Sequence, residues 1–399
     1  MKSFVEFLRE SLDTNFKLSD KDKDHLISLD KKYGKIHHMF DEELSHFQDI
    51  VDIHRNIEDF KKTYKEGKVY FPDIEYEKSK FDSDNFTENF IKDCDDLIKE
   101  FNDFQQCYLF KFYIDELEQL KARAEFYNAY SKDHSIVKGL YFAQPSEELY
   151  RAALECYTKN AYVSIKDTGD EDKFYKETHK AKDCIKIMQD EIDRQGYGWK
   201  VILDPHLVPR MSVKSYKEFD ICAYCNFSDA DIESLIVHEI NTHICRKANG
   251  NKLGLNLMLY GVGNSGDLDE GMAILNSLGN KHPKLNILYY ISQKIIINYW
   301  MNKKNFNEIY DFLIAITPTN DNPDQIIKYI IREHRCTFYT LDPAYSLSQG
   351  MDYFIGYEYV KDLPKSDRET LMKYNIGKKM LPELPNFIKF FKENKFKPL

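Results

Sequence analysis

Residues 228–250 read S-D-A-D-I-E-S-L-I-V-H-E-I-N-T-H-I-C-R-K-A-N-G, and this stretch predicts the central helix of the fold. Ser228 and Asp231 fit a capping box, in which the hydroxyl accepts an amide hydrogen and the carboxylate bonds back to the first residue. Apolar residues then recur at helical spacing and predict one buried face. Asn249-Gly250 predicts the helix end, because both residues accept the left-handed backbone that closes a helix.

His238, Glu239 and His243 form an H-E-x-x-x-H pattern in the middle of this helix. Two imidazoles and a carboxylate are costly to bury unless a partner such as a divalent metal ion binds them. The usual zinc helix has the shorter spacing H-E-x-x-H. Here five steps of about 100° would place the two histidines about 140° apart on a regular helix. A wider turn of roughly 4.4 residues would return both to one face, so we predict a π-type distortion between them.

A tetrahedral catalytic zinc ion takes three protein ligands and keeps its fourth position for water. Glu270 is the predicted third ligand, 32 residues after His238 and just past the glycine-rich segment 261–266. It begins an apolar run that predicts a second helix. This helix could pack against the first and direct one carboxylate at the metal.

The combined motif, H-E-I-N-T-H-I-C-R-K-A-N-G followed by D-E-G-M-A, resembles a known family pattern, H-E-x-G-T-H-x-x-R-x-x-N-G … E-G-L-A. That pattern belongs to the microtubule-associated tyrosine carboxypeptidases and their bacterial relatives, the flavohaemoglobin expression-modulating QEGLA-motif proteins. Asn241 replaces the family's Gly. The resemblance implies that His238, His243 and Glu270 bind zinc and that Glu239 is the general base. It also implies an α+β, mainly helical, gluzincin-like zinc-metallopeptidase fold with a small sheet beside the H-E-x-x-x-H helix.

The resemblance continues near the C-terminus, where Arg332-Glu-His-Arg335 fits the family's R-x-x-R and Tyr353-Phe-Ile-Gly356 fits Y-L-x-G. The Lys-Asp pair that precedes Y-L-x-G in the family is absent. A carboxypeptidase must bind a free α-carboxylate, which a guanidinium does through paired hydrogen bonds. It must also stabilise an oxyanion, which a tyrosine hydroxyl can do. Arg335, with Arg332, is the predicted carboxylate binder and Tyr353 the oxyanion donor; the alternative is a surface arginine and a core tyrosine.

The chain divides into three predicted parts. Residues 1–66 predict two charged amphipathic helices that pack against the main body. Residues 67–195 predict a helical subdomain, and residues 196–399 predict the zinc-peptidase core. The stretch 66–399 is expected to form one packed unit.

Two strand-like segments, 197–204 and 216–224, precede the central helix and predict a small sheet beside it. The second segment could be an edge strand that adds an extended substrate as a further strand. Alternatively, it only covers the core. Cys222 and Cys225 form a C-x-x-C pattern within it. Because residues three apart on a strand point to opposite faces, this position favours two structural cysteines over metal or redox chemistry.

Composition limits the other classes of function. The net charge of -10 argues against a general nucleic-acid binder. No stretch approaches the ~20 apolar residues of a membrane span, and the charged N-terminus does not fit a secretory signal. The eight cysteines are scattered, which fits a reducing compartment. We therefore expect a cytoplasmic protein, or one exported by a route without such a signal.

These observations together predict a zinc-dependent metallocarboxypeptidase. By resemblance, it removes a C-terminal Tyr or another aromatic residue from a peptide or protein. Tubulin is suggested as a substrate only by analogy with eukaryotic relatives, and the natural substrate stays open. Zinc would activate the attacking water, and Glu239 would transfer its proton to the leaving amine. Two alternatives stay open: a regulatory binding protein that retains the zinc site without hydrolysis, and a zinc endopeptidase. The sequence does not define the oligomeric state.

Overall fold

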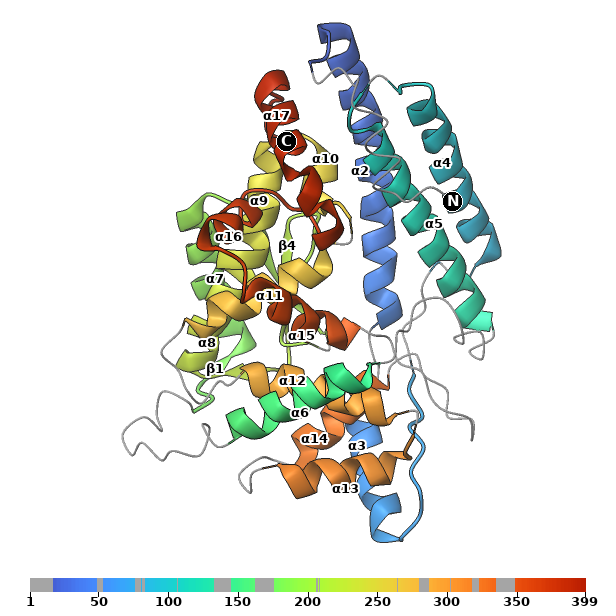
Figure 1. Cartoon of the computed structure of the whole chain (residues 1–399). Coiled ribbons are helices and arrows are strands. Elements are labelled where there is room, and N and C mark those ends of the chain that lie inside the picture. The colour runs from blue at the N-terminus through green and yellow to red at the C-terminus, as the bar shows by residue number, and fades with distance from the viewer. Residues whose placement is uncertain are drawn as a thin grey trace.

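The computed structural model shows a mainly helical α+β protein with two small sheets (Figure 1). The prediction of an α+β fold, mainly helical with a small sheet, is therefore confirmed. No helix in the described part of the chain is long and apolar enough to cross a membrane. The structure describes residues 17–48, 53–75, 80, 83–105, 107–132, 145–161, 176–205, 207, 209–263, 265–279, 287–301, 303–317, 323–334 and 349–399.

Three long helices pack side by side along one flank of the molecule: α2 (Asp20–Gln48), α4 (Asp84–Asn102) and α5 (Phe110–Lys132). The buried carboxylate of Asp30 on α2 accepts hydrogen bonds from the backbone amides of Asn256 (2.8 Å) and Leu257 (3.1 Å). These amides open the short helix α10 (Asn256–Tyr260). Asp30 thus satisfies free donors at a helix start, which ties α2 to helix α10.

A second layer is built from helices whose apolar faces share one core. It contains α3 (Ile53–Lys65), α6 (Glu147–Ala161), α12 (Ile287–Trp300), α13 (Phe306–Ile316), α14 (Pro323–Glu333) and α15 (Gln349–Val360). Helix α13 begins with a capping box. The Asn305 side chain accepts a hydrogen bond from the Glu308 amide (3.0 Å), and the Glu308 carboxylate accepts one from the Asn305 amide (2.9 Å).

Two sheets lie beside helix α7 (Ala181–Gln195). In the larger sheet, β2 (Lys200–Asp204) runs parallel to β4 (Glu218–Cys222), and β3 (Met211–Val213) runs antiparallel to β4. The smaller sheet pairs β1 (His179–Lys180) with β5 (Asn226–Phe227). Because β4 lies between β2 and β3, the edge-strand interpretation of residues 216–224 is wrong. Both sides of β4 already have backbone partners, so it cannot add a substrate strand.

The central helix is continuous but changes its winding. It runs as α8 (Asp229–Leu235), the π-helix η5 (Ile236–Ile244) and α9 (Cys245–Lys252). The predicted capping box is confirmed, with Ser228 Oγ accepting from the Asp231 amide at 3.1 Å. The predicted stop at Asn249-Gly250 is wrong, since both residues are helical. The left-handed residue that follows α9 is Gly254, with a φ of 80°.

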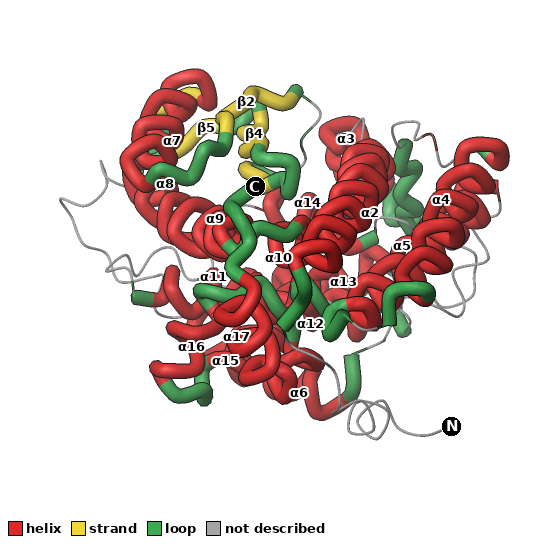
Figure 2. Tube along the Cα trace, turned by 90° about the horizontal axis from the view of Figure 1, so that it is seen from above, coloured by secondary structure: helices red, strands yellow, loops and turns green. Residues whose placement is uncertain are grey.

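The last third of the chain contributes helices to a second hydrophobic core, which also contains α2, α4 and α5. Helix α11 (Gly266–Leu278) packs against η5, and the chain ends with α16 (Lys365–Leu371), the 3-10 helix η6 (Lys378–Glu383) and α17 (Leu384–Asn394). One continuous core takes buried side chains from α2, α4, α5, α10, α11 and α17. Figure 2 shows α9 and α10 between the sheets with α7 on one side and α2, α4 and α5 on the other. The π-helix η5 thus packs against α7 and β3 on one side and α11 on another.

Candidate active site

The π-helix brings the two histidines of the H-E-x-x-x-H pattern together. Their ring centroids lie 5.0 Å apart. Within the widened turn, Thr242 Oγ1 donates to the carbonyl of Val237, five residues earlier, at 2.9 Å. Asn276 Nδ2 of α11 in turn donates to Thr242 Oγ1 at 2.8 Å. The predicted π-type distortion between His238 and His243 is thus confirmed, and side-chain hydrogen bonds reinforce it.

Glu270, on the first turns of α11, completes a cluster of three potential ligand atoms. Glu270 Oε2 lies 3.5 Å from His238 Nε2 and 3.6 Å from His243 Nε2. Ligands at about 2.1 Å from a tetrahedral zinc ion lie about 3.4 Å apart, so this spacing fits one ion. Glu270 Oε2 is buried and makes no hydrogen bond to any residue that the structure describes. We refer to His238, His243 and Glu270 as the ligand cluster.

The charge of Glu270 also suits a cation. Burial alone would raise the pKa of Glu270, but His243 and His238 hold that pKa down, at about 2. The carboxylate is therefore ionised at neutral pH, which is the form that binds a metal. Two imidazole nitrogens and one carboxylate oxygen form a donor set that zinc prefers, and they leave room for a fourth ligand.

A carboxylate behind the cluster fixes the orientation of His243. Asp269 Oδ2 lies 2.8 Å from His243 Nδ1, so the opposite nitrogen, Nε2, faces Glu270. The other oxygen of Asp269 accepts from the guanidinium of Arg246, which is fully buried. Arg246 also donates to the carbonyls of Leu371 (3.1 Å) and Ile376 (3.2 Å). Sequence analysis missed this role of Asp269, although the residue stands directly before Glu270 in the D-E-G-M-A motif.

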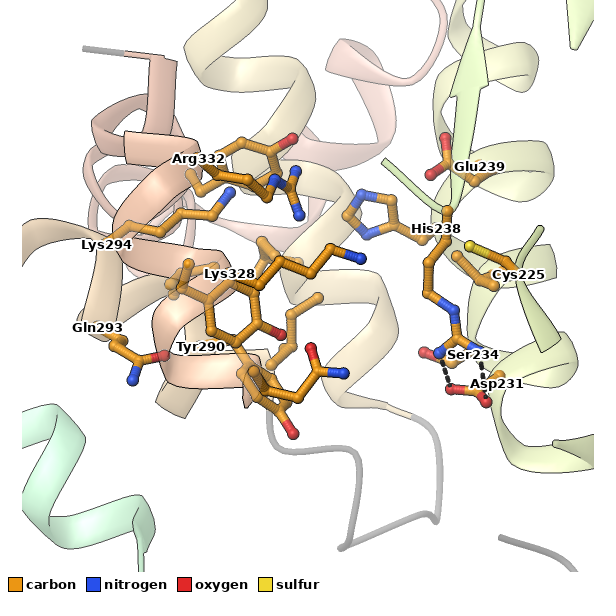
Figure 3. A pocket seen from close by; sticks show the side chains of 18 of the residues that line it. Cys225, Asp231, Ser234, His238, Glu239, Tyr290, Gln293, Lys294, Lys328 and Arg332 are labelled. Carbon is orange, nitrogen blue, oxygen red and sulfur yellow. Dashed lines mark hydrogen bonds and ion pairs between the residues drawn. The ribbon is translucent and has the colours of Figure 1, made fainter. Parts of the chain in front are cut away.

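Glu239 directly follows His238 in the sequence, and its side chain faces a cavity of about 640 Å³. Its side chain is largely buried, and burial raises the pKa of Glu239 above its ordinary value. A carboxylate with a raised pKa accepts a proton more readily, as a general base near neutral pH requires. Figure 3 shows Glu239 and His238 on one wall of this cavity.

The opposite wall of the cavity carries positive charge. Lys294 of α12 and Lys328 and Arg332 of α14 extend toward the space in front of His238 (Figure 3). Arg332, one of the two arginines predicted to bind a carboxylate, thus lines the cavity, while Arg335 lies outside the described residues. Lys294 and Lys328 were not predicted, because helical spacing alone does not show which face of α12 or α14 meets the cavity.

Tyr353 of α15 also lines the cavity, and Lys294 Nζ lies 3.8 Å from the centre of its ring. The carboxylates of Glu270 and Glu239, together with burial, raise the pKa of Tyr353 well above its ordinary value. The hydroxyl therefore stays protonated and can donate a hydrogen bond. The structure thus places Tyr353 in the wall of the same cavity as His238 and Glu239.

Two glycines let α15 approach α11 closely enough for this. A Cβ at Gly356 would lie 1.9 Å from the carbonyl oxygen of Asp267, and a Cβ at Gly271 would lie 2.3 Å from the carbonyl carbon of Gly356. Both glycines belong to the motifs quoted above, E-G-M-A and Y-F-I-G. Their function is therefore close helix contact, which holds Tyr353 beside Glu270.

Comparison with known families adds a decisive observation. The model of the family described as microtubule-associated tyrosine carboxypeptidase matches residues 58–335, which is most of the chain. The chain belongs to this family. The match includes the ligand cluster, Glu239 and Arg332, whereas Tyr353 lies beyond its end. No curated protein matches the sequence. The family's name describes a peptidase that removes a C-terminal residue.

Proposed function

We propose that this protein is a zinc-dependent carboxypeptidase that removes one C-terminal residue, Tyr or another aromatic. The convergence of His238, His243 and Glu270 beside Glu239, at the end of a cavity with cationic side chains, carries this proposal. Family membership supports the peptidase class. A bound zinc ion would supply Lewis-acid chemistry, lowering the pKa of a water molecule toward about 7 and polarising the scissile carbonyl.

Glu239 acts as the general base in this proposal. It accepts the proton of the attacking water and delivers it to the amine of the leaving residue. Its carboxylate is largely buried but faces the cavity, and the raised pKa supports proton transfer near neutral pH. Asp269 keeps His243 in one tautomer and one orientation throughout the reaction.

Tyr353 stabilises the oxyanion that forms at the scissile carbonyl. Its hydroxyl remains a donor because the neighbouring carboxylates of Glu270 and Glu239 disfavour its ionised form. A donor held in place before the reaction stabilises developing charge without reorganisation, which is worth about 10²–10³ in kcat for a single oxyanion donor.

The α-carboxylate of the substrate binds to the cationic wall. Arg332 can offer two parallel N–H donors to it, and Lys328 adds charge one helical turn earlier. Arg335, the carboxylate binder predicted from the sequence, is proposed to act together with Arg332. Apolar and aromatic residues of the same cavity suit an aromatic side chain of the departing residue: Ile274, Ile287, Tyr290, Ile291, Ile326 and Tyr329.

The substitution Glu239→Gln tests the proposal while preserving side-chain volume. The variant should bind one zinc ion per chain, as the native protein does, and lose about 10²–10⁴-fold in turnover. Glu233→Gln, an exposed change on α8 of the same continuous helix, is the matched control and should keep native activity. Native turnover by Glu239→Gln would refute the base assignment. Zinc binding without cleavage by the native protein would favour the regulatory binding alternative.

A further inference from the structure

The C-x-x-C pattern lies at a chain reversal and not within a strand. Strand β4 ends at Cys222, and the Cys225 amide then donates to the Cys222 carbonyl at 3.2 Å. A turn of this type brings its first and fourth Cα atoms within about 7 Å, a separation that overlaps the range of disulfides. The interpretation that the two side chains point to opposite faces is therefore wrong. The Cys225 thiol lies close enough to Cys222 to form a side-chain hydrogen bond with its sulfur.

The environment of the pair favours a thiolate. The Cys225 thiol, acting as a donor, and the backbone amides of Tyr224 and Cys225 lower the pKa of Cys222 to about 6. In contrast, burial raises the pKa of Cys94 and of Cys107 to about 12. The C-x-x-C pair thus differs from these buried cysteines, because thiolates react with oxidants and thiols do not.

One cysteine of the pair is accessible from the catalytic cavity. Cys225 is partly exposed and lines the same cavity as His238 and Glu239 (Figure 3). Cys222 is 7% exposed. Tyr224, between them, is 76% exposed and also lines the cavity. A small oxidant that enters the cavity can therefore reach this turn.

We infer that Cys222 and Cys225 form a reversible disulfide in the wall of the catalytic cavity, with a peroxide as the oxidant. The Cys222 thiolate attacks one peroxide oxygen, the O–O bond breaks, and the released hydroxide takes a proton to become water. Cys222 is then a sulfenic acid. The Cys225 sulfur attacks the Cys222 sulfur, the S–O bond breaks, and the hydroxyl leaves with the Cys225 proton as a second water. Two thiols are oxidised and one peroxide is reduced.

Oxidation would change the charge of the cavity. The reduced pair carries a thiolate that interacts with Lys328, whereas the disulfide is neutral. Lys328 would then bind the α-carboxylate of a substrate more strongly. This consequence rests on the proposed carboxypeptidase function, but the disulfide itself does not. Oxidised protein should therefore show a several-fold lower KM for a peptide with a free C-terminus.

Peptide mapping of the full-length protein tests the disulfide. After exposure to hydrogen peroxide, free thiols are blocked with N-ethylmaleimide, and the denatured chain is cut with chymotrypsin. Cleavage after Phe219, Tyr224 and Phe227 would separate residues 220–224 from 225–227. We expect these two peptides to remain joined until a reductant is added. In Cys225→Ser, Cys222 should instead be trapped as a sulfenic acid by dimedone.

The control Cys184→Ser removes a buried cysteine outside the cavity and should still give the joined peptides. Recovery of both peptides separate and fully alkylated, after peroxide has oxidised other cysteines of the chain, would overturn the inference. A link from either cysteine to Cys245 would overturn it as well. A confirmed disulfide with unchanged KM would refute only the charge effect on substrate binding.

Discussion

The contact between α11 and α15 gives a sharp prediction, because Gly356 leaves no room for a side chain. An added Cβ would lie 1.9 Å from the Asp267 oxygen and 3.0 Å from the Gly271 nitrogen. Ordinary contacts begin near about 3.5 Å, so Gly356→Ala must separate the helices by about 1.5 Å. Overpacking of this kind costs about 1–3 kcal/mol, which exceeds the gain of up to ~1 kcal/mol from alanine's helix propensity.

The same displacement would move Tyr353, one turn from Gly356, away from the ligand cluster. A misplacement of about 1 Å in an active site can reduce the rate about 10²-fold. We therefore expect Gly356→Ala to lose about 10²-fold in kcat/KM, measured by release of a C-terminal residue from a peptide. Urea unfolding should show a loss of about 1–2 kcal/mol in the free energy of unfolding.

Gly266→Ala is the matched control for this change. Gly266 begins α11, and a Cβ there would meet nothing within 4 Å. This control should keep full activity and gain up to about 1 kcal/mol in stability. If Gly356→Ala were as active and as stable as Gly266→Ala, the role of close helix contact in holding Tyr353 would be refuted.

Three further changes test other parts of the account. Asp269→Asn should raise the dissociation constant for zinc about 10–100-fold in chelator competition, because His243 loses its orienting carboxylate; an unchanged constant would contradict this. Arg332→Ala should raise KM about tenfold or more for peptides with a free C-terminus, and equal losses on C-terminally amidated peptides would exclude carboxylate binding. The third change is at Glu116 on α5. Burial raises the pKa of the Glu116 carboxyl from 4.5 to about 7. The folded state therefore binds more protons than the unfolded chain between these values, and the protein loses stability as the pH rises through this window. Glu116→Gln should remove that loss, up to roughly 3 kcal/mol, in urea unfolding at pH 5 and pH 8; parallel pH profiles of variant and native protein would contradict it.

The core of the site could be predicted because its information is local. The spacing of His238 and His243 on one helix fixes their angular separation, and a shared metal then requires a wide turn. The start of that helix follows from Ser228 and Asp231, which satisfy backbone donors within one turn. Glu270 needed the resemblance as well, since no periodicity shows which carboxylate of a second helix faces the first.

The features that sequence analysis missed depend on contacts between distant segments. Gly250 fits a helix-stop pattern, but its function is close packing: a Cβ there would lie 2.1 Å from the Met258 carbonyl oxygen. The central position of β4 depends on β3, a strand of three residues that is too short to give an alternating pattern. The proximity of Cys222 and Cys225 likewise depends on where β4 ends. Strand ends and close approaches are set by tertiary packing, which a single sequence does not show.

Mass spectrometry of a mixed peptide set incubated with zinc-loaded protein tests the central claim most directly. The set should contain peptides that differ only in their C-terminal residue, each also in an amidated form, with Glu239→Gln protein incubated in parallel. The account predicts loss of a single C-terminal residue, fastest for Tyr and other aromatics, with native protein and free C-termini only. Internal cleavage would show an endopeptidase and contradict the assigned role of Arg332. Peptides left intact by protein that binds zinc would contradict the carboxypeptidase proposal.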